Sequence, residues 1–392
     1  MKYFTGGLRF LMFVILALLA ACANQPVVAD RMPAANSAQS KLNWGLVFDP
    51  SKNTAEPIRS QLNRVVEIAD GSLSIEFHSV TSLHLAGTLN SDPERVESEK
   101  AKATFPQIFD LAICARLATS PLKDQCLVKV RSAIMTWVSV YQVSGNPIDE
   151  ASFSPVFLGI DLVLPLLSND DRGLILDWIK QFATEGDRFF AKMNPNTDTR
   201  LKNNWMAWRL FIRGTVAKIT GDPALTSNTQ AMIHDFVYNN ILRDQSGNLL
   251  DGKTYDFVQR DALHYHLYDL EPLVRLRLSA PELIDATSYE SIEKSLLFIK
   301  PFYTGDQQHI EFVHTTVQFD ITRAQAGQTD YMNLPWNPTQ ARVFLREARP
   351  AFPSIQPWTD NVVDVKYDPM IKLLSASFGE TTPMGSGPPS HQ

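Results

Sequence analysis

The stretch of residues 254–274 concentrates side chains that can transfer protons or bind anions. It reads Thr-Tyr-Asp-Phe-Val-Gln-Arg-Asp-Ala-Leu-His-Tyr-His-Leu-Tyr-Asp-Leu-Glu-Pro-Leu-Val. Its members include Arg260, His264, His266, Tyr255, Tyr265 and Tyr268. Tyrosine and histidine serve as general acids and bases, and arginine binds carboxylates through paired N–H groups. Such a density is unusual for a packed core and predicts a functional site.

A second segment upstream carries complementary groups. Residues 201–210 read Leu-Lys-Asn-Asn-Trp-Met-Ala-Trp-Arg-Leu, which places Asn203 and Asn204 beside Trp205 and Trp208. Amides and arginine can neutralise a carboxylate by hydrogen bonding, and tryptophan can stack on a sugar ring. Together, the two segments indicate an enzyme that acts on an acidic polysaccharide.

The elements that must position these residues are mostly helices. Apolar residues recur at three-to-four spacing, and Asn, Asp, Gly or Pro separate the runs. The predicted helices span residues 94–118, 127–143, 152–167, 171–191, 204–220, 224–241, 260–280, 289–302 and 338–349. Consecutive helix pairs with short turns favour a mainly α fold, an α/α toroid or incomplete helical barrel. Residues 62–89 alternate instead and predict a small β element near the N-terminus.

The N-terminus has the features of an export signal. A basic start precedes an apolar run over residues 10–20, which is too short for a comfortable membrane span. The run ends in Leu-Ala-Ala-Cys at Cys22, which resembles the lipobox of bacterial lipoproteins. The resemblance implies lipidation of Cys22 and, because Ala23 rather than aspartate follows, a periplasmic protein anchored to the outer membrane. An ordinary secretory signal that ends near a cysteine is the alternative.

The rest of the chain is expected to form one large domain. We expect a signal peptide over residues 1–21, a flexible tether over 22–42, a toroid domain over 43–375 and a disordered tail over 376–392. The net charge of −6 and the lack of a basic arm argue against nucleic acid as a partner. A local basic cleft on an acidic protein can still bind a polyanionic sugar. We expect a monomer.

Two cysteines remain besides Cys22, namely Cys114 and Cys126. In an oxidising periplasm they predict a disulfide, with two separate buried thiols as the alternative. Neither cysteine has a histidine at ligand spacing, so we expect no metal site there.

The two polar segments, taken with four others, resemble the alginate lyase family of polysaccharide lyases. The resemblance rests on the paired asparagines at 203–204, the R-x-A-L-x-Y-H pattern at 260–266, and matches at 137–148, 311–320, Arg323 and 333–338. It implies an α/α toroid with a cleft, and β-elimination of a uronic-acid polymer without a cofactor. In that reaction a base removes the C5 proton, an acid protonates the leaving oxygen at C4, and the enzyme neutralises the neighbouring carboxylate.

The resemblance also implies roles for individual residues. Tyr265 takes the position of the catalytic tyrosine, and Arg260 is the expected partner of the substrate carboxylate or of the tyrosinate. Asn204 matches the asparagine that neutralises the carboxylate, with Asn203 beside it. His264 lies one helical turn after Arg260 and is expected on the same face.

The chain departs from the family where a histidine is expected after the paired asparagines. Trp205 and Trp208 occupy both possible positions, and tryptophan cannot act as a base. Either Tyr265 works alone, with polar support from His264 or His314, or the protein only binds an acidic polysaccharide within an export or assembly system. A glycoside hydrolase is a third possibility, but the site segments contain no clear pair of acids.

Several neighbouring residues also have a purely structural interpretation. His266 is predicted to be structural, and Trp205 and Trp208 are either core residues or sugar-stacking surfaces. Asp320 and Arg323 are predicted to form a local helix or turn pair.

Replacing Cys22 with serine is expected to release the protein from the membrane fraction, because the acceptor for the lipid is lost. Fractionation and immunodetection of wild type and Cys22→Ser measure this. Continued tight anchoring of the variant would rule out lipidation at Cys22.

Overall fold

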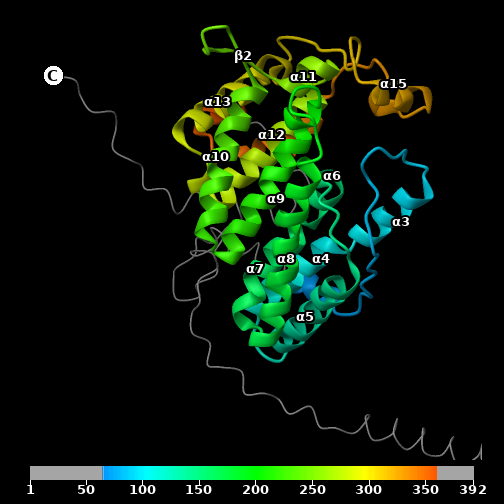
Figure 1. Ribbon diagram of the computed structural model, residues 1–392. Helices are drawn as coiled ribbons and strands as arrows, with labels where there is room; N and C mark the ends of the chain where they lie inside the picture. The colour runs from blue at the N-terminus through cyan, green and yellow to red at the C-terminus, as the bar shows by residue number, and fades with distance from the viewer. Residues whose placement is uncertain (1–63, 65, 360–392) are drawn as a thin grey trace, which may run out of the picture. The chain divides into compact units, whose positions relative to one another are not determined.

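The computed structural model describes residue 64 and residues 66–359 (Figure 1). The expected signal peptide, Cys22, the tether and the tail lie outside these residues. The longer helices are α3 (Pro93–Lys102), α4 (Phe105–Leu117), α5 (Leu122–Val140), α7 (Ser154–Val163), α8 (Asn169–Phe190), α9 (Asn204–Thr220), α10 (Pro223–Asn240), α12 (Leu263–Ser279), α13 (Ala286–Phe298) and α15 (Gln318–Gln325). The shorter ones are α6 (Pro147–Glu150), α11 (Tyr255–Arg260), α14 (Lys300–Thr304), α16 (Arg342–Ala348) and α17 (Gln356–Thr359).

Successive helices pack against one another around the domain. Helix α4 contacts α5 and α7, α8 contacts α9, and α9 in turn contacts α10 and α12. Figure 1 shows α8, α9 and α10 side by side, while α3 and α15 stand at one edge. This arrangement confirms the predicted mainly α fold, an α/α toroid.

Local sequence signals set the ends of the helices that matter most for the site. Asn203 caps α9, since its side chain accepts a hydrogen bond from the Trp205 N–H. Gly221 ends α9 with a φ of 67°, and Asp222 caps α10 directly afterwards. Helix α9 is therefore fixed at both ends and holds its polar first turn in one place.

An aromatic cluster forms much of the core beneath the helices. Its rings meet mostly edge to face, an arrangement that adds to the free energy gained from burial. The cluster comprises Phe105, Trp137, Tyr141, Phe153, Phe157, Trp178 and Phe182. These rings come from α4, α5, α7, α8 and the loops between them, so they join the successive helix pairs.

The predicted β element near the N-terminus is wrong. Residues 66–72 are helical, and residues 73–92 contain no strand. Within the described part of the chain, the sheet consists of β1 (Ile241–Arg243) and β2 (Leu249–Thr254), which pair antiparallel. The alternating segment lacks a partner strand: Thr81 accepts from the Gln142 N–H, and the N–H groups of Leu85 and Ala86 donate to the Asp149 carboxylate.

The predicted helix over residues 94–118 is two helices, α3 and α4. The break falls at Ala103 and Thr104, and Pro106 in the first turn of α4 cannot donate an N–H to a continuous helix. Among the described residues, no helix is long and apolar enough to cross a membrane.

Cys114 and Cys126 are joined by a disulfide between α4 and α5, with Cα atoms 5.9 Å apart. Both side chains are fully buried in the core. The bond ties two consecutive helices across the short turn that connects them.

Replacing both cysteines with alanine is expected to lower the free energy of unfolding by about 2–4 kcal/mol, because the unfolded chain regains the freedom that the cross-link removes. Urea unfolding of wild type and the double variant measures the difference. With a thiol reductant in both samples, the difference should shrink. Identical unfolding midpoints without reductant would contradict the stabilising role.

Candidate active site

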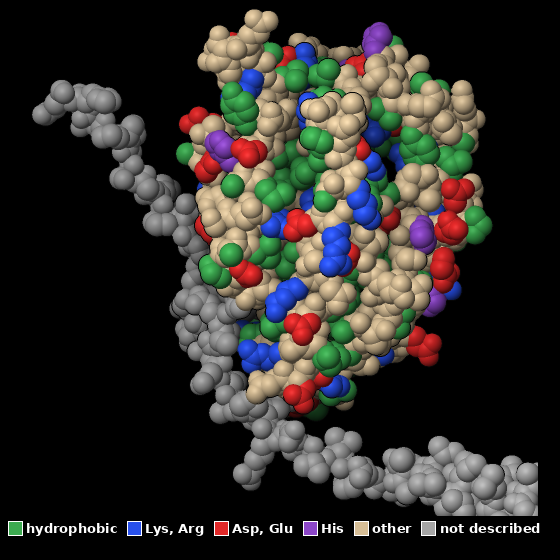
Figure 2. All heavy atoms as spheres, viewed as in Figure 1, with side chains coloured by type: hydrophobic (Ala, Val, Ile, Leu, Met, Phe, Trp, Pro, Cys, Tyr) green, Lys and Arg blue, Asp and Glu red, His purple; other side chains and the backbone are tan. Residues whose placement is uncertain are grey.

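A pocket of about 610 Å³ brings the two polar segments together. Its lining includes the predicted residues Asn204, Trp205, Trp208, Arg260, His264 and Tyr265. The pocket is also lined by Tyr268, Glu271, Phe319, Arg323 and Tyr331. Helix α3 contributes Arg95 and Lys102 to the lining, together with residues 85–87. Figure 2 shows a recess between the regions that Figure 1 labels α6 and α15, with basic side chains at its edge.

The chain reverses between Arg260 and Tyr265, which corrects the prediction of one helix over residues 260–280. Arg260 ends α11, Asp261 adopts the left-handed conformation with a φ of 52°, and α12 begins at Leu263. Aspartate tolerates this conformation better than most residues, but the sequence contains no glycine to signal the break. Because of the turn, the Arg260 guanidinium lies over the Tyr265 ring, 3.7 Å from its centroid.

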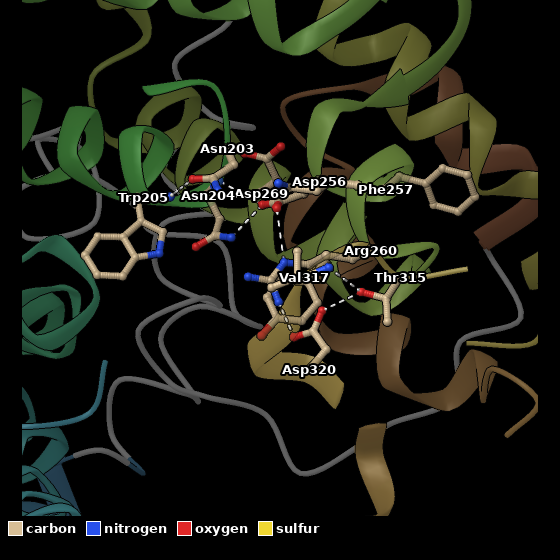
Figure 3. Close-up of polar contacts among 12 residues, drawn as sticks. Asn203, Asn204, Trp205, Asp256, Phe257, Arg260, Asp269, Thr315, Val317 and Asp320 are labelled. Atoms are coloured by element: carbon tan, nitrogen blue, oxygen red, sulfur yellow. Dashed lines mark hydrogen bonds and ion pairs between the residues drawn. The ribbon is translucent and has the colours of Figure 1, made fainter. Parts of the chain in front are cut away.

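Arg260 is held between two carboxylates in the interior. Its Nε donates to Asp256 at 3.3 Å, and its Nη1 donates to Asp320 (Figure 3). Burial opposes the charge, but Tyr265, Asp256 and Asp320 raise the pKa of the guanidinium. Arg260 therefore remains a fixed cation. The sequence suggested that Asp320 pairs with Arg323, but in the structure Asp320 pairs with Arg260.

Asp256 also positions Asn204. Its carboxylate, which is fully buried, accepts from the Asn204 backbone N–H at 2.8 Å and from Asn204 Nδ2 at 2.5 Å (Figure 3). The side-chain nitrogen Nδ2 carries two hydrogens, so one N–H of Asn204 remains for a ligand in the pocket. One aspartate thus orients both the amide and the guanidinium that the sequence predicted to act together.

A second buried acid lies behind Asp256. Burial and the nearby charge of Asp256 raise the pKa of Asp269 well above its usual range. Asn240 Nδ2 donates to Asp269 at 2.6 Å and to the Lys202 carbonyl at 2.8 Å. Burial also raises the pKa of Asp256, but Arg260 and Asn204 favour its ionised form, whereas the hydrogen-bond partners of Asp269, Asn240 and Thr254, are neutral. The negative charge therefore belongs on Asp256 and the proton on Asp269.

The Tyr265 hydroxyl lies in a second polar cluster that the sequence only partly revealed. Arg323 Nη1 donates to the Tyr265 oxygen at 3.1 Å and to the Tyr331 oxygen at 2.5 Å. The two hydroxyl oxygens are 3.2 Å apart. Burial raises the pKa of Tyr331, so Tyr331 stays protonated and can donate its O–H to Tyr265. The Tyr265 oxygen can then accept two hydrogen bonds, from Arg323 and from Tyr331.

Tyr331 was not predicted as a site residue. It belongs to no motif, and it lies in the chain beyond α15, where it contacts Tyr265 and Phe312. Arg323 lay within the resemblance, but its role was assigned to a local pair. Only the folded chain shows that both side chains meet Tyr265.

His264 faces the pocket, where its side chain stays accessible to solvent. Desolvation by the surrounding walls is the main cause that lowers the pKa of its imidazole. Asp330 opposes this effect, whereas Arg260 and Arg323 add to it. A neutral imidazole beside Tyr265 can both accept and donate a hydrogen bond.

The tryptophans differ in their surroundings. Trp208 is 4 % exposed and packs on Tyr268, so it belongs mainly to the core. Trp205 is half-buried at the pocket, where it stacks on Phe189 and has Arg200 within cation–π distance. Of the two, only Trp205 offers partly accessible ring surface to a sugar.

Two predicted binding residues do not line the pocket. Asn203 is buried and serves as the cap of α9. His314 has an 83 % exposed side chain and pairs through Nδ1 with Asp261 at 2.8 Å. His266 is fully buried between Thr254 and the Ser295 carbonyl, in agreement with a structural role.

Among residues 64 and 66–359, no group of three or more His, Cys, Asp or Glu side chains could hold a metal ion.

Replacing Asp256 with asparagine is expected to lower the free energy of unfolding at pH 7 by about 3 kcal/mol, because buried Arg260 loses a negative partner and one of the two acceptor oxygens becomes an N–H donor that faces Arg260 or Asn204. Urea unfolding measures this change. Asp235→Asn, on the exposed face of α10, provides the matched control and should be nearly neutral. A loss below about 1 kcal/mol in Asp256→Asn would contradict the organising role of this carboxylate.

Comparison with known proteins places the chain in a family. The family model described as alginate lyase matches residues 34–295. That range contains Asn204, Arg260 and Tyr265, and it ends before Arg323 and Tyr331. No curated protein matches the sequence. Since the match covers more than half of the 392 residues, the chain belongs to the alginate lyase family of polysaccharide lyases.

Proposed function

We propose that this protein cleaves a uronic-acid polymer, alginate or a related uronan, by β-elimination at Tyr265. The supporting observation is the environment of one oxygen. The Tyr265 hydroxyl receives a hydrogen bond from Arg323 in the pocket, and Arg260 covers the face of the same ring. Donors aimed at an oxygen favour negative charge on it, which a phenol needs in order to act as a base.

The proposed reaction uses Tyr265 twice. As the phenolate, Tyr265 takes the proton from C5 of the uronate, and the electron pair forms the C4–C5 double bond. The bond from C4 to the glycosidic oxygen breaks at the same time. Tyr265 then donates the proton to that oxygen, so the phenolate is restored and no water is consumed. One group suffices where the proton and the leaving oxygen lie on the same face of the sugar.

The charge of the pocket supports an acidic substrate. Its basic lining residues are Arg95, Lys102, Arg260 and Arg323, against one acidic side chain, Glu271. The whole protein has a net charge of −6, so the cationic pocket is a local feature. The free N–H of Asn204 lies on the same wall and can bind the carboxylate whose charge otherwise resists removal of the C5 proton.

His264 offers a second polar group where the family histidine is missing. Its ring meets the Tyr265 ring edge to face at 5.2 Å. We propose that it supports substrate binding beside Tyr265, while Trp205 borders the sugar. For location, we propose a lipid anchor at Cys22 in the outer membrane, which would place the enzyme in the periplasm.

Tyr265→Phe is expected to lower the elimination rate by about 10²-fold or more, because only the proton-transferring oxygen is lost. Ultraviolet absorbance measures the reaction, since elimination creates a conjugated, unsaturated uronate. Purified protein is incubated with alginate, glucuronan and related polymers. Tyr238→Phe, an exposed tyrosine on α10, is the matched control and should retain the wild-type rate.

Two outcomes would contradict the proposal in different ways. A Tyr265→Phe variant that keeps more than about a tenth of the wild-type rate would exclude the proton-transfer role. A wild type that binds uronans without any rise in absorbance would identify a polysaccharide-binding protein instead of an enzyme.

A further inference from the structure

The segment over residues 309–317, here called the strap, lies against the turn that separates Arg260 from Tyr265. It follows the range matched by the alginate lyase family, which ends at residue 295. The Phe312 N–H donates to the Asp261 carbonyl at 2.7 Å, and the Thr316 N–H donates to the Gln259 carbonyl at 2.9 Å. The strap therefore pairs with the turn at its left-handed residue, Asp261, and two residues before it.

Glu311 of the strap caps helix α12. The N-cap residue of this helix is Ala262, which has no side-chain acceptor. The Glu311 carboxylate takes its place, accepting from the Leu263 N–H at 2.8 Å through one oxygen and from the His264 N–H at 3.2 Å through the other. A carboxylate suits this position because the first N–H groups of a helix carry partial positive charge.

The neighbouring residue of the strap touches the proposed catalytic ring. Phe312 is 3 % exposed and adopts a φ of 65°, which is uncommon for a bulky residue. Its ring lies 6.0 Å from that of Tyr265 and 5.1 Å from that of Tyr331. The cap at the start of α12 and the contact with Phe312 together restrict where the Tyr265 hydroxyl can lie.

We propose that Glu311 is a positioning residue for Tyr265: by capping α12 as a carboxylate, it fixes the first turn of the helix and aims the tyrosine hydroxyl at Arg323. This inference rests on the proposed lyase function. Glu311 itself does not line the pocket and need not touch the substrate.

Glu311 should give the activity a recognisable pH dependence. Burial is the main cause that raises the pKa of its carboxyl to about 7, and Asp261 of the turn adds to this effect. His309 of the strap lies 3.8 Å away, and the N–H groups of α12 favour the ionised form. As the pH rises through about 7, the cap ionises and kcat should increase.

Stability should respond in the opposite direction. A carboxyl whose pKa is raised on folding contributes stability that is complete below its unfolded value and is lost as the pH rises through the folded value. The contribution of Glu311 therefore falls between its ordinary value of 4.5 and about 7, the window in which activity rises. For a residue that contributes only to stability, kcat would not rise over the pH range in which the free energy of unfolding falls.

The test compares Glu311→Gln with wild type on a uronan, from pH 5 to pH 9. Glutamine keeps the size but presents only one oxygen to the two N–H groups, so kcat above pH 7 should fall by about tenfold with little change in KM. The rise of kcat near pH 7 should be weakened or absent in the variant. Glu282→Gln, which removes an exposed carboxylate paired with Lys218, is the matched control and should behave as wild type.

Two further measurements do not depend on turnover. Amide hydrogen exchange at Leu263 and His264 should be faster in Glu311→Gln, and the Tm of wild type should fall relative to that of the variant as the pH rises from 5 to 8. An active wild type whose Glu311→Gln variant keeps its kcat and its amide protection would overturn this inference alone. A wild type inactive on every uronan would overturn the proposed function, and the positioning role with it.

Discussion

The arrangement of the pocket depends on the ion pairs of the buried Arg260 guanidinium. A cation in the interior needs paired anions, and Arg260 has them from two directions: Asp256 within its own helix and Asp320 at the start of α15. Asp256 in turn holds Asn204 at the start of α9. Through one charge, three segments far apart in sequence are fixed around Tyr265. Any substitution that leaves this charge without a partner should disturb all three.

The same constraint bears on the proposed proton transfer in a site that lacks the expected histidine. In the family pattern a histidine follows the asparagines, whereas here Trp208 is packed into the core and Trp205 borders the pocket. The positive charges are instead concentrated around the phenol, with Arg260 over its face and Arg323 at its oxygen. Fixed charges in a partly desolvated site stabilise developing negative charge more strongly than they do in water. A tyrosine between two arginines therefore has the surroundings that a base requires.

The sequence predicted many of the helices well, because they depend on local signals, and it brought out three residues that the structure places in one pocket. Helical periodicity and caps gave α9 and α10 nearly to the residue, and chemical type singled out Asn204, Arg260 and Tyr265. Prediction from the sequence failed where a contact between distant segments determines the local structure. The alternating residues near the N-terminus found no partner strand. Asp261 adopts the left-handed conformation without a glycine to signal it, and the strap holds the turn through the carbonyls of Gln259 and Asp261. Tyr331 and Glu311 act on Tyr265 only in the folded chain.

That turn shows why the site needs more than the helices of the toroid. Arg260 and Tyr265 are five residues apart, so a continuous helix through residues 260–280 would place them on different faces. The guanidinium would then point away from the tyrosine ring. The break brings them together, but it also exposes the first N–H groups of α12, and Ala262 cannot satisfy them. Glu311 supplies the missing acceptor, and Asp320 after the strap supplies the second anion for Arg260. Glu311 of the strap thus completes the cap of the helix that carries Tyr265, and Asp320 of α15 completes the ion pair of Arg260. Both residues follow the family-matched range, so the geometry of the proposed base depends on chain beyond residue 295.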